Sequence, residues 1–319
     1  MKKIEFKDVY KSYEDNQILN NINFYVNSGE AFVIVGPSGS GKSTILNLIA
    51  GVIKQNSGQI FMNGKEVTHD SPKSRNVSFV FQNFALYPHM TVYNNIAFAL
   101  KSKKLSKSDI QSRINSITEK LHIEKLLNRY PRELSGGQKQ RVALARALAT
   151  EADVLLMDEP LSSLDTDLRL KLREELKVFH KENNTTLIFV THDQTEAMTL
   201  ADRIMVINNG TVEQIGTPHE IYMRPRTPFV GKFIGTPKMN LFKDETGTLF
   251  GIRPQHIKIS DSNLGEPTVI TSIDYLGQEN WVHFEYDSHP FVLVTQRMDL
   301  EVGQTIHITM DESNIATFN

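Results

Sequence analysis

The sequence contains no cysteine in its 319 residues. Disulfide-stapled folds, thiolate metal sites and cysteine catalysis are therefore excluded, and the composition is typical of a reducing compartment. Uninterrupted apolar runs of about 18 residues are also lacking, and the start Met-Lys-Lys-Ile-Glu has no apolar signal-peptide core. We therefore expect a soluble, cytosolic chain that does not cross a membrane alone.

An excess of charge of one sign is missing as well. Lys plus Arg number 35 and Asp plus Glu number 37, which gives a formal charge of −2. Such a balance gives no reason to expect a strongly basic face, so we expect no nucleic-acid partner. The ten histidines form no H-x-x-x-H pair, so we expect no histidine metal site. The length predicts roughly two domains.

The first part of the chain, up to about residue 235, alternates short apolar runs with helical patterns. This alternation predicts an α/β layer with a largely parallel, buried sheet. The expected strands are residues 31–35, 154–157 and 187–190, and the expected helices are residues 43–49, 139–148, 168–179 and 195–200.

The C-terminal part has a different pattern. Residues 222–240 carry three prolines and two glycines, which indicates a linker. The short strand-like stretches that follow, separated by turn residues, predict a small β-barrel of the oligonucleotide/oligosaccharide-binding (OB) type. These expected strands are residues 249–253, 256–260, 268–275, 281–286, 291–295, 305–309 and 315–318.

A glycine-rich loop follows the first apolar run and matches G-x-x-x-x-G-K-[ST] between a strand and a helix. Glycines let several backbone N–H groups point at one phosphate, and the new helix adds its positive end. Lys42 is expected against the β and γ phosphates of a bound nucleotide, and Ser43 is expected to ligate Mg²⁺. The candidate ATP-binding residues of this loop are Gly36, Pro37, Ser38, Gly39, Ser40, Gly41, Lys42, Ser43 and Thr44.

A second apolar strand ends in two carboxylates, Asp158 and Glu159. Asp158 is placed to hold Mg²⁺ through its water shell. Glu159, one residue further on, is expected to polarise the attacking water as a general base. Together with the phosphate loop, this pair predicts hydrolysis of a nucleoside triphosphate.

Residues 134–138 form a third motif, which precedes the expected helix over residues 139–148. Its exposed amides predict a second anion site at a helix N-terminus. In this order the motifs resemble the ATP-binding-cassette (ABC) ATPases, whose signature motif the third one matches, so the chain is interpreted as an ABC-type ATPase. The signature residues, which the resemblance assigns to the ATP held by the opposite subunit, are Leu134, Ser135, Gly136, Gly137 and Gln138.

The resemblance assigns further residues. Gln82 is similar to the glutamine that contacts Mg²⁺ and the attacking water, and His192 to the switch histidine at the γ-phosphate. Asp165, at the end of residues 162–165, resembles the loop that crosses the dimer seam. Tyr13 resembles the aromatic residue that stacks on adenine. The implied catalytic set is therefore Lys42, Gln82, Glu159 and His192, and the implied Mg²⁺ set is Ser43, Gln82 and Asp158.

The resemblance also gives the domain organisation. Residues 1–238 are expected to form a P-loop NTPase cassette with a helical subdomain between Gln82 and Leu134. That interval is too short for the long coiled coil of chromosome-maintenance ATPases. Residues 239–319 are expected to form an all-β accessory domain of the TOBE type, because residues 251–257 resemble the accessory barrel of importer ATPases.

Residues 83–95 and 233–240 resemble the ATPases of sugar and glycerol-phosphate importers, in which the first stretch receives a helix of the permease. The alternative for that stretch is a well-packed apolar loop. The implied assembly is a homodimer on two transmembrane permease subunits, at the cytoplasmic face of the membrane, served indirectly by an extracytoplasmic solute-binding protein. Importers of polyamines, ferric iron or oxyanions share these motifs, and a non-transport regulatory ABC ATPase is the other alternative.

Overall fold

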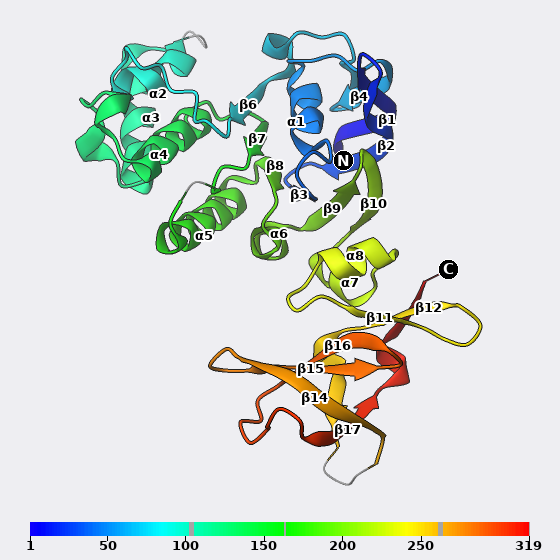
Figure 1. Ribbon diagram of the computed structural model, residues 1–319. Coiled ribbons are helices and arrows are strands. Elements are labelled where there is room, and N and C mark those ends of the chain that lie inside the picture. Colours follow the sequence, from blue (N-terminus) through cyan, green and yellow to red (C-terminus); the bar gives the residue numbers. More distant parts are fainter. Residues whose placement is uncertain (102–104, 163, 261–263, 319) are drawn as a thin grey trace. The chain divides into compact units, whose positions relative to one another are not determined.

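The structure of the protein is a computed structural model that describes residues 1–101, 105–162, 164–260 and 264–318. The chain divides into two compact units, Met1–Pro218 and His219–Asn319. The first is α/β and the second is mainly β (Figure 1). The predicted α/β fold class with a small all-β domain is confirmed.

A six-stranded sheet forms the centre of the first unit, in the order β10-β9-β3-β8-β7-β6. Neighbouring strands are parallel except β9 and β10, which form an antiparallel pair. The strands β3, β7 and β8 are buried along their whole length, as expected of a sheet covered on both faces. The bounds are β3 Ala31–Val35, β6 Val77–Val80, β7 Val154–Asp158, β8 Thr186–Thr191, β9 Arg203–Asn208 and β10 Thr211–Gly216.

A second sheet, entirely antiparallel, precedes and follows the first helix in the sequence, and the sequence patterns did not predict it. Its order is β2-β1-β4-β5. Register shifts between β1 and β2 interrupt the two-residue alternation that would have revealed the strands. The bounds are β1 Lys2–Tyr13, β2 Asn16–Asn27, β4 Ser57–Met62 and β5 Lys65–Glu66.

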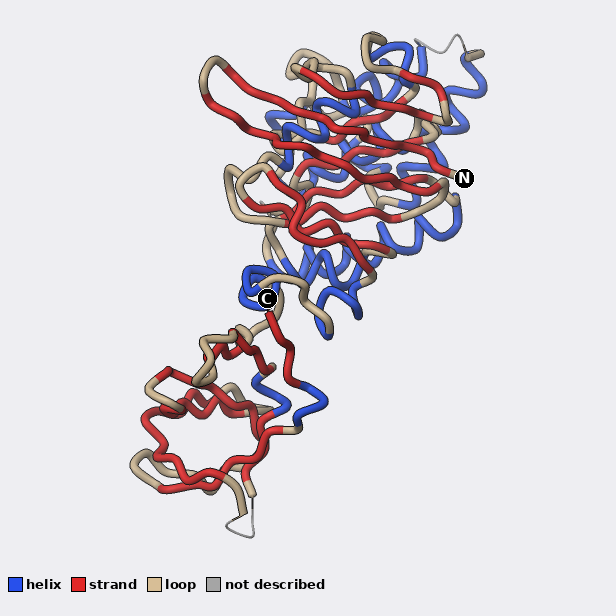
Figure 2. The backbone as a smooth tube through the Cα atoms, turned by 90° about the vertical axis from the view of Figure 1, so that its right-hand side faces the viewer, coloured by secondary structure: helices blue, strands red, loops and turns tan. Residues whose placement is uncertain are grey.

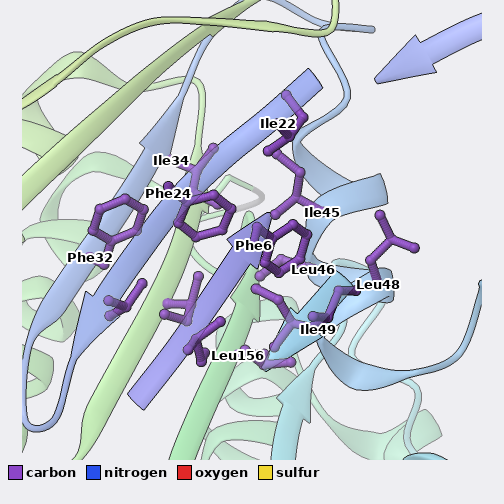
Figure 3. Packing of buried hydrophobic residues seen from close by; sticks show 14 of the residues in the cluster. Phe6, Ile22, Phe24, Phe32, Ile34, Ile45, Leu46, Leu48, Ile49 and Leu156 are labelled. Atoms are coloured by element: carbon purple, nitrogen blue, oxygen red, sulfur yellow. The ribbon is translucent and has the colours of Figure 1, made fainter. Parts of the chain in front are cut away.

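The main hydrophobic core joins the two sheets through α1 (Lys42–Ala50) (Figure 3). Phe6 and Phe24 of the antiparallel sheet stack at 4.6 Å between ring centroids, and Phe24 lies 5.5 Å from Phe32 of β3. Ile45 of α1 and Leu156 of β7 belong to the same cluster. The helix that begins at the phosphate loop is therefore held by apolar contacts from both sheets.

The remaining helices of this unit agree with the expected pattern. Helices α5 and α6 follow β7 and β8, whereas α2 and α3 form the helical subdomain predicted between Gln82 and Leu134 and pack together with α4 (Figure 1). The bounds are α2 Val92–Lys101, α3 Lys107–Lys120, α4 Gly136–Leu148, α5 Thr166–Asn183 and α6 Gln194–Leu200.

The second unit contains two antiparallel sheets that curl into a half-barrel (Figure 2). Their orders are β11-β12-β18 and β13-β17-β14-β15-β16. Asn240 connects the sheets, because its amide donates to the Val292 carbonyl at 2.8 Å and accepts from the Val292 amide at 2.9 Å. The bounds are β11 Asn240–Lys243, β12 Leu249–Ile252, β13 Ile257–Ile259, β14 Glu266–Tyr275, β15 Asn280–Tyr286, β16 His289–Thr295, β17 Thr305–Met310 and β18 Ile315–Phe318.

The predicted linker over residues 222–240 is wrong for Pro228–Phe233, which form α8 after the short α7 (Pro218–Met223). Gly231 of α8 lies so close to Met239 that an added Cβ would come within 2.7 Å of its sulfur. Arg253 is buried and donates to the Tyr222, Gly231 and Ile234 carbonyls. Proline begins these short helices because its missing N–H costs nothing at a first turn.

Candidate functional site

The glycine-rich loop connects β3 to α1 as predicted. An added Cβ at Gly36 would lie 2.1 Å from the Ile207 carbonyl oxygen, so only glycine fits there. Gly41 has φ +99° and directly precedes the first residue of α1, a conformation that favours glycine. The Ser40 hydroxyl is buried without a hydrogen-bond partner among the described residues. The loop therefore presents unsatisfied donors at a helix N-terminus, which is the arrangement that binds phosphate.

Lys42 is folded back into this loop and is 5% exposed. Its ammonium donates to the carbonyls of Gly36 and Pro37, both at 2.8 Å. Burial lowers the pKa of Lys42, while the nearby carboxylates of Glu159 and Asp158 oppose that shift. The cation is thus held within reach of the loop and of both predicted acidic residues.

Asp158 ends β7, and its carboxylate accepts a hydrogen bond from the Ser43 hydroxyl at 2.9 Å. Burial raises the pKa of Asp158, and the Ser43 bond partly opposes this. A hydroxyl and a buried carboxylate are oxygen donors of the kind Mg²⁺ prefers, and a cation would compensate the cost of burying the carboxylate. These two residues therefore fit the expected Mg²⁺.

Glu159 lies next to Asp158 but outside the strand. Its φ of +45° turns the chain, and its amide donates to the Val190 carbonyl at 2.9 Å. The carboxylate accepts from the Gln82 amide at 3.3 Å, and His192 Nδ1 lies 3.1 Å from the same oxygen. The structure therefore brings together Gln82, Glu159 and His192, which follow the ends of the neighbouring strands β6, β7 and β8 and were predicted from separate motifs.

The signature residues begin α4. Ser135 accepts from the Gln138 amide at 3.3 Å, and the Gln138 side chain accepts from the Ser135 amide at 3.0 Å, which makes a capping box. Leu134 is buried, and an added Cβ at Gly137 would meet Leu168, whereas one at Gly136 would meet no atom of the described part of the chain within 4 Å. Among the described residues, no hydrogen bond connects this motif to the phosphate loop of the same chain.

Two other predicted residues lie apart from the cluster. Asp165 is the N-cap of α5 and accepts from the Leu168 amide at 2.9 Å. Ser163, in the same predicted seam loop, lies outside the described residues. Tyr13 is half-exposed at the end of β1, with the Lys11 ammonium 4.5 Å from its ring centroid. An exposed ring is available for stacking, but the structure places no catalytic group beside it.

Sequence reasoning missed the residues that surround His192. Asp193 caps α6 through the amides of Thr195 and Glu196, and it lies 3.6 Å from Arg169 of α5. The order Asp, two residues, Glu before an apolar helix start is a capping signal that would have revealed Asp193 and Glu196. No comparable signal distinguishes Arg169 from the other basic residues of its helix.

Two general features bear on the class of protein. In the part of the chain that the structure describes, no helix combines the length and apolarity needed to cross a membrane. Within those same residues no three histidine, aspartate or glutamate side chains form a metal-binding group.

Comparison with known families and proteins agrees with this site. The ABC transporter family matches residues 19–162, and the TOBE domain family matches residues 250–318. The sn-glycerol-3-phosphate import ATP-binding protein UgpC of Yersinia pseudotuberculosis is 39% identical over 345 residues, covering 99% of this chain and 97% of that protein. The oligosaccharides import ATP-binding protein MsmX of Bacillus subtilis is 39% identical over 349 residues, covering 98% and 96%.

Solved structures give the same result for the cassette. The dimeric ATP-binding cassette MJ0796 in a post-hydrolysis state, bound to ADP and Pi, is 34% identical with a TM-score of 0.63, covering 67% of this chain and 98% of that one. The cbiO1 protein of Clostridium perfringens, part of the cbiONQ transporter complex, is 30% identical with a TM-score of 0.64. These similarities confirm the predicted resemblance and the predicted class of enzyme, an ABC-type ATPase. Similarity along the whole chain, together with a phosphate loop that faces two carboxylates, means that the protein belongs to the ABC transporter ATP-binding family.

Proposed function

We propose that this chain hydrolyses ATP to drive a multicomponent importer, with each site completed by a second copy of the chain. The observation that carries the proposal is the contact of the Glu159 carboxylate with both Gln82 and His192, beside the Lys42 ammonium. This geometry supports activation of a water at the γ-phosphate that the loop holds.

Each residue of the cluster has a distinct part in the proposed reaction. The amides of the phosphate loop and the Ser40 hydroxyl bind phosphate oxygens, and Lys42 stabilises the charge on the transferred phosphoryl group. Glu159 accepts a proton from the attacking water, and Gln82 and His192 hold its carboxylate in place. Ser43 and Asp158 are the residues that would hold Mg²⁺, which neutralises phosphate charge when bound.

The second copy supplies the signature motif in this proposal. Ser135 and Gly136 are exposed at the start of α4, where amides and the helix dipole favour an anion. Since no hydrogen bond among the described residues connects them to the loop of their own chain, their proposed ligand is the ATP of the partner. The relative MJ0796 has been solved as a dimer, which supports this arrangement.

The permease contact is proposed for the surface around residues 83–95. Phe98 is half-exposed and packs on Tyr87 at 4.9 Å, and Arg146 donates to the carbonyls of Phe84 and Ala85. An ordered, partly exposed aromatic surface of this kind suits a helix of another protein. It would hold the ATPase at the cytoplasmic face of the membrane, on two permease subunits.

The cargo proposed is a sugar or a glycerol-phosphate type of solute. Full-length relatives named as import ATP-binding proteins for glycerol-3-phosphate and oligosaccharides support it. The solute-binding protein and the permease contact the cargo, so this chain acts on it only through ATP. Co-purification with a permease, and transport of labelled solute by the assembled complex, test the proposal.

Glu159→Gln tests the hydrolytic assignment. The substitution keeps the shape but removes the base, so hydrolysis should fall roughly 10²–10⁴-fold while ATP binding remains. Lys42→Ala is the comparison, because losing a charged hydrogen-bond donor should weaken ATP binding itself by about 10-fold or more. Phosphate release and nucleotide-binding titrations measure the two effects. Turnover near wild type in Glu159→Gln would exclude Glu159 as the base.

Gly136→Asp tests completion of the site in trans. No atom of the described residues lies within 4 Å of an added Cβ at Gly136, and a carboxylate suits a helix N-terminus, so the monomer should fold and bind ATP normally. Its charge would repel the partner's ATP. In a Glu159→Gln background, ATP should double the mass measured by light scattering, and Gly136→Asp should abolish that doubling. An unchanged dimer would contradict the proposed placement of the signature motif.

A further inference from the structure

Contacts connect the loop after Glu159 to Arg169 and Asp193, and His192 beside Asp193 contacts Glu159 again. The Ser162 hydroxyl donates to the Glu159 carbonyl at 3.0 Å, at the start of the seam loop, residues 162–165. Arg169, in the first turn of α5, donates from Nη2 to the Leu164 carbonyl at 3.0 Å. Its Nη1 lies 3.6 Å from Asp193, beside His192, which returns to Glu159 at 3.1 Å.

The segment that contains His192, residues 191–196, is internally bonded. The Thr191 hydroxyl donates to the buried Glu196 carboxylate at 2.6 Å and accepts from the Asp193 amide at 2.9 Å. One oxygen of Asp193 accepts from the amides of Thr195 and Glu196, at 2.7 and 3.1 Å. Because these bonds surround His192 on both sides, a displacement of Asp193 carries the histidine with it.

Arg169 connects this segment to the seam loop. The planar guanidinium offers one amine to the Leu164 carbonyl and the other to the second oxygen of Asp193. The side chains of Arg169 and Asp193 are 32% and 29% exposed. Ion pairs so accessible to water contribute little to stability. The pair is therefore better suited to setting the position of a segment than to stabilising the fold.

We propose that Arg169 is a positioning residue for ATP hydrolysis. Because Arg169 contacts both Leu164 and Asp193, the position of Leu164 in the seam loop sets the distance between His192 and Glu159. The inference rests on the proposed function, in which Glu159 is the base and His192 holds it. When a partner subunit fixes the position of Leu164, Arg169 passes that position on to His192 through Asp193. A site without Arg169 binds ATP normally but holds the Glu159 carboxylate less well for the chemical step.

The test compares three variants of the full chain. Arg169→Met removes both the hydrogen bond to Leu164 and the ion pair with Asp193, and kcat for ATP should fall roughly 10–100-fold, as small misplacements of catalytic groups do. KM should stay within about 2-fold, because nothing that touches ATP is removed. Arg169→Lys keeps the charge but loses the planar guanidinium, so its kcat should lie between the values of wild type and Arg169→Met. Arg173→Met, half-buried one turn further along α5, is the matched control and should keep the wild-type kcat.

Asp193→Asn supplies an independent measurement. Asparagine still caps α6, so folding should be preserved while the charge facing Arg169 is lost. If both residues act through one connection, the double variant should lose no more kcat than the worse single variant. A wild-type kcat in Arg169→Met, an equal loss in Arg173→Met, or additive losses in the double variant would overturn the inference.

Glu159→Gln in the same assay separates the two proposals. If Glu159→Gln is inactive and the Arg169 variants are normal, only the positioning role is wrong. If Glu159→Gln hydrolyses ATP normally, the proposed function itself is wrong.

Discussion

At the scale of single residues, burial shifts the pKa of Glu196, a carboxyl group in the same segment as His192. Glu196 is 3% exposed, and this burial raises the pKa of its carboxyl above the ordinary value of 4.5, while the Thr191 hydrogen bond opposes the shift. Asp193 also raises this pKa, and Arg169 and His192 lower it by smaller amounts. The folded protein therefore binds the Glu196 proton more tightly than the unfolded chain does.

Glu196→Gln should consequently be stabilising at neutral pH. Because the folded pKa is raised, the contribution of Glu196 is most favourable below about pH 4.5 and is lost as the pH rises through the folded pKa. Glutamine keeps an acceptor for Thr191 and does not titrate. The melting temperature of the Glu196→Gln protein should exceed that of wild type at about pH 8, by about 2–4 °C for each kcal/mol of stability gained. The difference should vanish at about pH 4.

Glu196→Ala is the control, because it leaves the Thr191 hydroxyl without its acceptor and should lower the melting temperature at both pH values. A Glu196→Gln effect that is independent of pH would contradict the raised pKa.

Much of the site could be predicted at this scale because its chemistry imposes residue types at fixed spacing. Lys42, Ser43, Asp158 and Glu159 follow from two short motifs, and the structure brings them together. The positive φ of Glu159, which turns the residue out of its strand, could not be predicted, since it depends on the Val190 carbonyl of another strand. Arg169 was missed because its two partners are distant in sequence or belong to the backbone.

At the scale of elements, helices α1, α4, α5 and α6 each begin at a loop that carries residues assigned to the proposed function. Their first residues follow Gly41, Ser135, Asp165 and Asp193, and the last three accept hydrogen bonds from the helix amides. Helix starts present unpaired N–H groups and positive potential, which suits a site for phosphate. The capping residues therefore serve the helix and place the loops of the site at the same time.

Asp165→Ala tests the capping part alone. Removing an N-cap should lower the free energy of unfolding by about 1 kcal/mol, in the range of roughly 0.5–2 kcal/mol. Asp165→Asn keeps an acceptor for the Leu168 amide and should remain within about 0.5 kcal/mol of wild type. Urea denaturation followed by circular dichroism measures both. Equal losses in the two variants would show that the charge of Asp165, and not its cap, stabilises α5.

Element prediction succeeded where one periodicity continued and failed where it was interrupted. The buried strands β3, β7 and β8 and the seven predicted strands of the C-terminal part have direct counterparts, because a strand bounded by turn residues is a local signal. The long pair β1 and β2 was missed because bulges break its alternation. Helix α8 was taken for a linker because its one proline and one glycine carry the same sequence signal as a turn.

At the scale of the whole molecule, the division into two units lies at residues 218 and 219, whereas the sequence placed a boundary after residue 238. The difference comes from α8, whose Gly231 packs against Met239 and Phe318 of the C-terminal unit. Where the accessory domain begins as an independently folding part stays a prediction. The stability of the second unit can be followed separately, because the single tryptophan of the chain, Trp281, lies in β15 of this unit.

ATP should stabilise the first unit, because that unit holds the phosphate loop, and should leave the stability of the second unit unchanged. In the Glu159→Gln chain, ATP at about 100 times its Kd should stabilise the cassette by about 2.7 kcal/mol and raise its melting temperature by about 5–10 °C. Far-ultraviolet circular dichroism follows mainly the first unit, which holds α1 to α6, whereas tryptophan fluorescence follows only the environment of Trp281. If the units unfold independently, ATP moves the first midpoint and not the second. Equal shifts of both midpoints would show one cooperative unit and exclude a separately folding C-terminal domain.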